Sequence, residues 1–226
     1  MNKAIALALF VLCGEAIGQA QVPGRYFPLD HRQVPGVASR WNALTRPGAF
    51  GQPQPVQIHL PEKGTVSFYH GSPQRVVETQ APSQVGLFVG YTYRIKLSGL
   101  ESHPGVELYP TLEVIDRLHP PEGLAERFPI PVEITAEELE AALQDRMITK
   151  VIYLEQPDVA RPVESTGFLP VEELSPRENL MAAADHRGRP VAIFRLGGRI
   201  PDPQAPADEF YSQSPIQFST ATVPAE

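Results

Sequence analysis

The chain has 226 residues, a formal net charge of −7 and a single cysteine, and 42% of its residues are hydrophobic. That hydrophobic content is enough to bury a core, which excludes a fully disordered chain. Proline accounts for 25 residues, about twice the usual ~5%. Because proline is disfavoured in helix interiors and central strands, this content also excludes a compact all-helical bundle.

The N-terminus is typical of a secretory signal. Lys3 is followed by an apolar run over residues 4–12, and Gly18-Gln19-Ala20 places small residues at the two positions that signal peptidase reads. The run is too short to span a bilayer, which needs about 20 residues. We therefore expect residues 1–20 to be a signal peptide, and the mature protein to be secreted or periplasmic without a transmembrane segment.

Cysteine use and charge narrow the chemistry further. Cys13 lies inside the expected signal peptide, and Leu12 before it argues against lipidation, which generally requires a small residue there. The mature chain would then have no cysteine, which excludes disulfides, thiol catalysis and Cys-ligated zinc. The acidic balance, without a Lys/Arg cluster, argues against nucleic acid as a partner.

Composition suggests three parts after the signal peptide. Residues 21–54 are rich in Pro, Gly, Gln and Arg and lack a sustained period, so we expect a loosely draped arm. Residues 55–200 are expected to form the globular domain, and residues 201–226 a disordered tail in which residues 215–218 could dock. Four aromatic residues in the arm either pack on the domain or present a surface to a partner: Tyr26, Phe27, Trp41 and Phe50.

Several segments alternate apolar and polar residues. Residues 56–60 and 65–68 do so around the turn sequence Pro61-Glu62-Lys63-Gly64, which predicts a β-hairpin. Residues 89–97 predict an antiparallel strand with one buried and one solvent-exposed face. Its buried set is Val89, Tyr91, Tyr93, Ile95 and Leu97, and its exposed set is Gly90, Thr92, Arg94 and Lys96. Residues 106–115 continue this pattern, but Pro110 places that strand at an edge or on a bulge.

Two helices are predicted from their first residues. Thr135-Ala136-Glu137-Glu138 is a capping box, followed by an apolar stripe that reaches Met147. The β-branched run 148–154 then predicts an interior strand. Ser175-Pro176-Arg177-Glu178 repeats the capping pattern, with the helix ending near residues 186–188 and a strand over 191–196. The expected fold is a β-rich α+β domain: an antiparallel β-sandwich-like core with two short helices packed on it and flexible Pro-rich flanks.

Three segments, at residues 85–90, 105–114 and 188–197, resemble stretches of secreted proteins of planctomycete type. The resemblance covers roughly residues 80–200 of this chain. Such proteins carry no assigned activity, so the resemblance implies an exported, envelope-associated protein and supplies no catalytic residues.

The sequence contains no recognisable catalytic motif. Nucleophile elbows, H-E-x-x-H helices, P-loops and G-x-G-x-x-G turns are missing from the sequence. The densest polar cluster supplies weak metal-ligand candidates, because imidazole and carboxylate oxygens are the ligands that remain without cysteine. These candidates are His103, Glu107, Asp116, His119 and Glu122. Both histidines lie in turn sequences, so the alternative is that these residues are simply solvated.

Polar residues on the expected sheet also allow two interpretations. Arg94 and Lys96 on one strand, with Glu107 and Glu113 on the next, either form cross-strand charge pairs or line a ligand-binding face. Tyr109 is out of phase with the buried set of its strand, so it is expected to be an exposed aromatic.

These observations lead to a non-catalytic function without a cofactor. We expect an exported envelope protein that acts as a structural component or protein-interaction module, with envelope proteins as partners. The alternative is a module that binds a small ligand, carbohydrate or metal through loops 100–103 and 119–122. A hydrolase whose site is assembled from distant residues would have no signal in local spacing.

Overall fold

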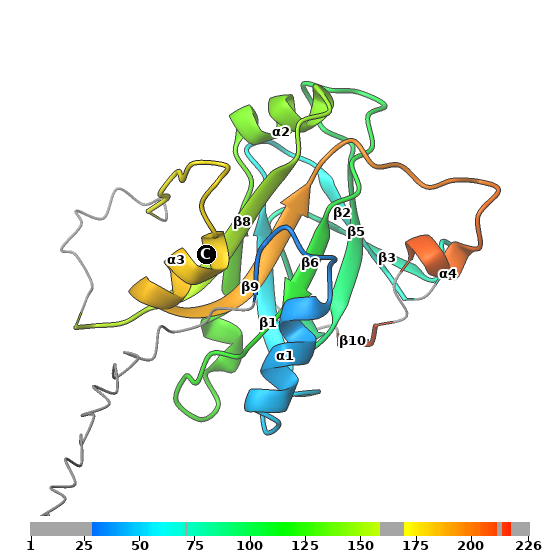
Figure 1. Cartoon of the computed structure of the whole chain (residues 1–226). Coiled ribbons are helices and arrows are strands. Elements are labelled where there is room, and N and C mark those ends of the chain that lie inside the picture. The colour runs from blue at the N-terminus through cyan, green and yellow to red at the C-terminus, as the bar shows by residue number, and fades with distance from the viewer. Residues whose placement is uncertain (1–28, 71, 159–169, 212–213, 218–226) are drawn as a thin grey trace, which may run out of the picture.

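The computed structural model describes residues 29–70, 72–158, 170–211 and 214–217 (Figure 1). The expected signal peptide, and Tyr26 and Phe27 of the expected arm, lie outside the described residues. Within the described parts of the chain, ten strands form two sheets that pack together as an open sandwich. The predicted β-rich, sandwich-like α+β fold is therefore confirmed.

The smaller sheet has four strands in the order β10-β4-β1-β7. They are β1 (Pro53–His59), β4 (Ser83–Phe88), β7 (Ile130–Glu133) and β10 (Ile216–Gln217). The larger sheet has six strands in the order β3-β2-β5-β6-β9-β8. They are β2 (Thr65–Tyr69), β3 (Val76–Gln80), β5 (Thr92–Ser98), β6 (Thr111–Val114), β8 (Ile148–Glu155) and β9 (Gly188–Leu196). Pairing is antiparallel except between β1 and β7, which are parallel.

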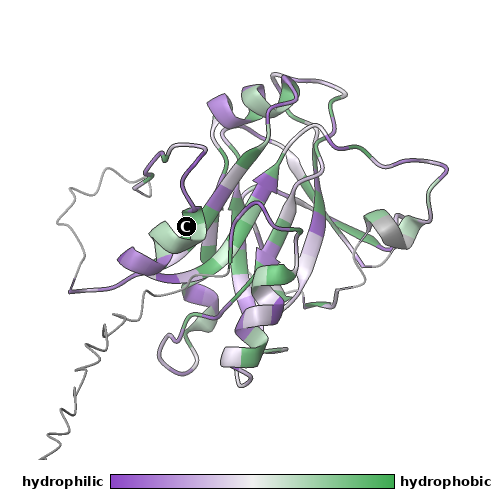
Figure 2. Cartoon of the chain, viewed as in Figure 1, coloured by the Kyte–Doolittle hydropathy of each residue, from purple (hydrophilic) through white to green (hydrophobic). Residues whose placement is uncertain are grey.

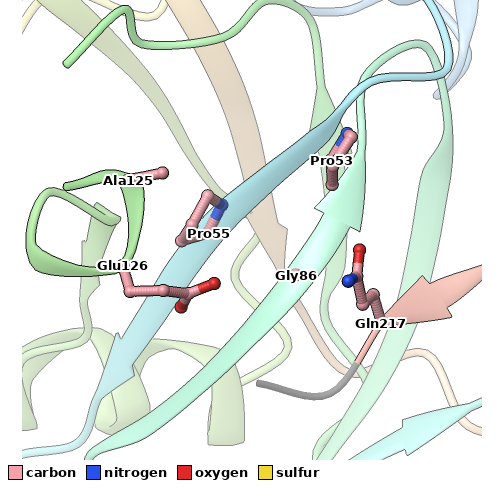
Figure 3. Close-up of a pocket in the computed structure, with 6 residues that line it drawn as sticks. All are labelled: Pro53, Pro55, Gly86, Ala125, Glu126 and Gln217. Atoms are coloured by element: carbon pink, nitrogen blue, oxygen red, sulfur yellow. The ribbon is translucent and has the colours of Figure 1, made fainter. Parts of the chain in front are cut away.

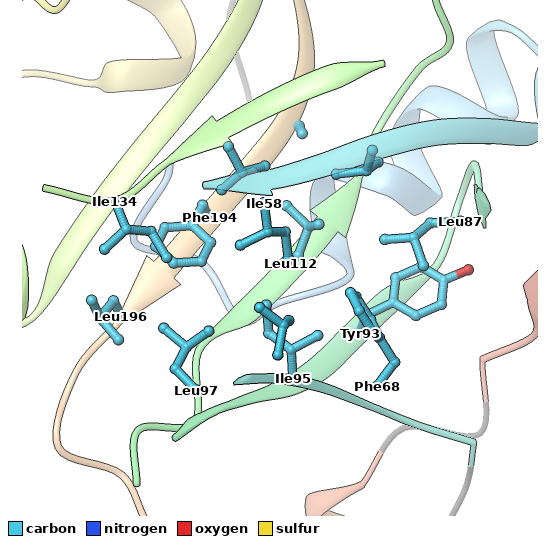
Figure 4. Packing of buried hydrophobic residues seen from close by; sticks show 14 of the residues in the cluster. Ile58, Phe68, Leu87, Tyr93, Ile95, Leu97, Leu112, Ile134, Phe194 and Leu196 are labelled. Carbon is cyan, nitrogen blue, oxygen red and sulfur yellow. The ribbon is translucent and has the colours of Figure 1, made fainter. Parts of the chain in front are cut away.

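The main core lies between the two sheets (Figure 4). Ile58 of the smaller sheet faces Leu112 and Phe194 of the larger one, and all three side chains are fully buried. In β5 the predicted alternation is confirmed, because Tyr93, Ile95 and Leu97 are buried while the residues between them are not in this core. The strand begins at Thr92 instead of Val89, and Tyr91, expected in the buried set, is only partly buried. Figure 2 shows apolar and polar residues alternating along the strands.

The other face of the six-stranded sheet was expected to be solvent-exposed, and this expectation is wrong. The helices α1 (Val37–Thr45) and α3 (Leu180–Arg187) lie over β6, β9 and β8 (Figure 1). The short helix α4 (Ala207–Phe210) places the Phe210 ring against the Arg94 guanidinium, whose Cζ lies 4.6 Å from the ring centroid. Tyr109, expected to be exposed, is buried in the same aromatic cluster. Elements distant in sequence cover this face, so a period-2 pattern could not reveal it.

The expected Pro-rich flanks are folded where the structure describes them. Residues 29–54 of the expected arm contain α1 and the start of β1, and α1 contacts β6. In the expected disordered tail, α4 packs on the aromatic cluster and β10 pairs with β4 through Ile216 and Gln217. Docking of the 215–218 segment is therefore confirmed for its described residues. Proline content suggested loose chain, but tertiary contacts override it.

Three strand predictions need correction. Residues 53–59 and 65–69 are strands, but β1 and β2 belong to different sheets, so the turn Pro61-Glu62-Lys63-Gly64 crosses between sheets instead of closing a hairpin. The run 148–154, expected in a sheet interior, forms the edge strand β8, which pairs only with β9 among the described strands. Conversely, β6 is an interior strand that starts only after Pro110.

The helix starts fit the predictions unevenly. Thr135 and Glu138 form the predicted capping box of α2 (Ala136–Leu143), with distances of 3.3 and 3.0 Å between donor and acceptor. The second predicted capping box, Ser175 to Glu178, forms a turn before the helix, with the Ser175 N–H donating to Glu178. The residue that caps α3 is Asn179. A 3-10 turn, η1 (Ala125–Arg127), completes the elements. In the described parts, no helix has the length and apolar character needed to cross a membrane.

Candidate interaction surface

The predicted ligand loop at residues 100–103 is tied to two neighbouring elements. His103 places its Nε2 3.1 Å from Glu140 Oε1 of α2, and its Nδ1 3.1 Å from Ser102 Oγ. Ser102 donates its hydroxyl to Glu62 Oε1 over 2.5 Å and its backbone N–H to Glu62 Oε2 over 2.8 Å. The hydrogen bond from Ser102 lowers the pKa of the Glu62 carboxyl.

These contacts resemble a catalytic triad in composition but not in hydrogen-bond direction. A carboxylate can only accept, so the Ser102 proton points to Glu62, and Ser102 Oγ is left to accept from His103 Nδ1–H. A serine nucleophile needs the opposite arrangement, in which the imidazole nitrogen accepts the serine proton. The cluster therefore fastens the loop to α2 and to the β1–β2 connection instead of activating Ser102.

The structure does not bring the five predicted metal-ligand candidates together. Glu107 pairs with Lys96 Nζ at 3.2 Å and accepts from Tyr109 Oη at 2.6 Å, and its pKa is lowered chiefly by the tyrosine hydrogen bond. His103 and Glu107 precede β6, whereas the exposed His119 and Glu122 follow it, at the opposite end of the strand. No group of three metal-ligating side chains forms within the described residues.

Asp116, the fifth candidate, already forms salt bridges with two arginines. Its carboxylate is 1% exposed and accepts from Arg46 at 2.5 Å and from Arg189 at 3.0 Å. Its Oδ2 accepts from both guanidiniums and its Oδ1 accepts from the Arg117 backbone N–H, so neither oxygen can bind a metal without losing a hydrogen bond. Loops 100–103 and 119–122 lie at opposite ends of β6, so they do not form the single ligand site that was predicted from sequence.

A shallow pocket opens on the outer side of the smaller sheet (Figure 3). Its volume is about 100 Å³, and Pro53, Pro55, Gly86, Ala125, Glu126 and Gln217 line it. Small-molecule sites usually measure about 300–1,000 Å³, so this pocket suits a few waters rather than a sugar or cofactor.

The helix α1 is unusual because its own sequence supports it weakly. Four of its nine residues, Ala38, Arg40, Ala43 and Leu44, are strong helix formers, and the other five are weaker ones. Gly36, which precedes the helix at φ 96°, offers no side-chain cap. A helix of this length is marginal alone in water, so its stability must come from the sheet beneath it.

Polar contacts fix α1 to the six-stranded sheet along its length. Near the start of the helix, the Ser39 backbone N–H donates to Glu113 Oε1 at 2.8 Å. Glu113, fully buried, also accepts from Arg195 at 3.1 Å. Asn42 Nδ2 donates to the Ile115 carbonyl at 2.5 Å. Just past the end of the helix, Arg46 pairs with Asp116. Buried charges cost free energy unless they are paired and hydrogen-bonded, and here each has its partner.

The outward side of α1 carries apolar side chains. Helical spacing places Val37, Arg40, Trp41 and Leu44 on one surface strip, which we call the α1 stripe. Trp41 is 47% exposed and Leu44 76%, and Val34 just before the helix is also exposed. Ala38, Ser39 and Asn42 occupy the side that contacts the sheet. The sheet thus holds a short, poorly self-sufficient helix in place with its tryptophan outward.

From the sequence, Trp41 and Phe50 of the arm either pack on the domain or face a partner, and in the structure they differ in their ring contacts. Phe50 is 46% exposed, about as much as Trp41, but its ring stacks on Tyr91 of its own domain with centroids 5.6 Å apart. Trp41 has no ring contact among the described aromatic pairs. Apolar residues at positions 37, 41 and 44 fit one face of a helix, and this spacing could have predicted the stripe. Three residues are too few to distinguish such a pattern from chance.

No protein-family model matches this sequence, and no curated protein or solved structure is significantly similar to it.

Proposed function

We propose that this protein is an exported, non-catalytic interaction module that docks onto an envelope partner through the α1 stripe. The proposal is carried by the contrast between the two sides of α1. Beneath the helix, the buried carboxylates of Glu113 and Asp116, which we call the clamp, hold it to the sheet. On its outer side, Trp41 and Leu44 are exposed.

Two physical arguments support this assignment. Tryptophan is among the residues most enriched at the energetic centres of protein interfaces, because it buries a large area with few rotatable bonds. A surface that is already rigid loses little conformational entropy on binding, and buried polar tethers provide that rigidity. A helix kept only for the stability of its own domain would gain more by burying Trp41 than by exposing it.

The export part of the proposal comes from the signal-like residues 1–20. A chain with this leader would act outside the cytoplasm, where envelope proteins are the available partners. Docking through α1 does not depend on whether the protein stays in the periplasm or reaches the cell surface, because both compartments present protein surfaces.

Co-purification from cross-linked envelope fractions tests the proposal. The tagged wild-type protein is compared with a Trp41→Ala/Leu44→Ser variant, and with a Met147→Ser/Leu154→Ser control that removes two other exposed apolar side chains. We expect a reproducible partner with the wild type and the control, and its loss with the α1 variant at an unchanged melting temperature. Equal recovery from all three proteins, or turnover of a hydrolase substrate panel by the purified protein, would contradict the proposal.

A further inference from the structure

Charge is distributed unevenly over this acidic protein. Residues 29–52 contain Arg32, Arg40 and Arg46 against the single acidic residue Asp30, an excess of two positive charges in a chain whose net charge is −7. The carboxylates that contact this segment from the sheet, Glu113 and Asp116, are at most 1% exposed. Arg32 pairs with Asp30, so the exposed charges that remain on this segment are the guanidiniums of Arg40 and Arg46, and the carboxylate that pairs with Arg46 lies beneath the helix.

Two details keep this surface positive. Asp116 is shared by Arg46 and Arg189, so two cations meet one anion, and the Arg46 side chain remains 50% exposed. Arg40 belongs to the α1 stripe itself, one helical turn before Leu44. The exposed apolar side chains are thus bordered by positive charge.

We propose that the partner presents an acidic, amphipathic protein segment to the α1 stripe. Its apolar side chains would cover Trp41 and Leu44, and its carboxylates would meet Arg40 and Arg46. Arginine favours this pairing because its planar guanidinium can hold a carboxylate through two parallel hydrogen bonds. The inference rests on the proposed function, and adds to it the charge and chemical class of the partner.

Other occupants fit the charges less well. A second copy docked α1 to α1 about a two-fold axis would bring like-charged arginines together, which is unfavourable. An anionic membrane is an extended plane that acts on the whole molecule, whose net charge of −7 it would repel. A protein segment lies within about one Debye length, roughly 10 Å, of the arginines and experiences mainly the local positive charge.

The single tryptophan makes a direct test possible, because Trp41 is the only one in the chain and its emission reports solely on the α1 stripe. The probe is a synthetic helical peptide with leucine at helical spacing and glutamate elsewhere. The matched peptide has lysine in place of every glutamate. We expect the glutamate peptide to shift Trp41 emission to the blue and to shield it from acrylamide, and the lysine peptide to do neither.

Charge reversal gives the second arm of the test. Arg40→Glu should weaken binding of the glutamate peptide on the order of tenfold, since it replaces an attraction with a repulsion. Arg146→Glu, an exposed arginine in the turn after α2, is the matched control and should change affinity little. Added salt should weaken the wild-type complex more than the Arg40→Glu complex, which keeps only the Arg46 contact.

Several results would overturn the inference. An equal shift with the lysine peptide, or equal affinity for the Arg40→Glu variant, rules out an acidic partner. A stronger shift with vesicles of anionic phosphatidylglycerol assigns the stripe to a membrane, and a concentration-dependent doubling of mass by light scattering assigns it to a second copy. If the cross-linked partner still depends on Trp41 and Leu44 while these peptide tests fail, the docking surface stands and only the acidic partner is wrong.

Discussion

Replacing Glu113 with glutamine removes the charge at the centre of the clamp beneath α1. The native carboxylate is fully buried, 3.1 Å from Arg195 and 2.8 Å from the Ser39 backbone N–H. Glutamine keeps the shape and can still accept from Ser39, but it leaves the buried guanidinium without a counter-charge. Breaking a buried ion pair on one side typically costs about 3–5 kcal/mol, and the retained Ser39 contact places this variant near the lower end.

A loss of about 3 kcal/mol corresponds to a melting temperature about 6–12 °C lower for a domain of this size. Urea unfolding followed by Trp41 emission measures the free energy directly, because Trp41 is the only tryptophan and lies on the clamped helix. The denaturant slope should stay constant if only native-state stability changes.

A double-mutant cycle measures the coupling free energy between Glu113 and Arg195. Arg195→Gln alone should also destabilise strongly, since it leaves the buried Glu113 charge unpaired. The double variant should lose about 1–3 kcal/mol less than the two single losses combined. The reasoning would be refuted if Glu113→Gln cost under about 1 kcal/mol and the two changes were additive.

Three further predictions follow from other described contacts. Burial lowers the pKa of His31 below its ordinary 6.5, and its Nδ1 accepts from the Leu180 N–H at the start of α3. The unfolded chain therefore binds the proton more readily, so stability is retained above pH 6.5 and falls below it. In urea titrations His31→Asn should flatten this slope, and an unchanged slope would contradict the assignment. Thr135→Ala should cost about 1 kcal/mol in thermal unfolding while Thr135→Ser costs little; equal losses would argue against the capping role. Zinc should leave the melting temperature unchanged in both the wild type and His103→Ala, and a His103-dependent rise would restore the metal site.

The sequence predicted those features that depend on neighbouring residues. The alternation around Tyr93 and Ile95 reflects the period of a strand whose one face is buried, and this holds whichever strands lie beside it. The capping box at Thr135 likewise needs only the residue three positions later. Both predictions were confirmed because a short window contains all of the interactions involved.

Features that depend on distant residues were missed. Glu113 appears on the polar side of its strand, but it is buried because Arg195 and Ser39, 82 and 74 positions away, satisfy it. The turn after β1 has hairpin chemistry, yet that chemistry does not specify whether the next strand returns to the same sheet. The helix α1 is too short to be stable alone. It forms because Glu113 accepts a hydrogen bond from its backbone and Asp116 pairs with Arg46 just after it.

The most direct test of docking through the α1 stripe is site-specific photo-cross-linking in intact envelopes. A photoreactive phenylalanine analogue replaces Leu44, and in a separate protein it replaces Met147, which is similarly exposed beyond α2. We predict a discrete adduct of one defined mass from position 44 and none from position 147. The same adducts from both positions, or none from position 44, would contradict the assignment of α1 as the docking surface.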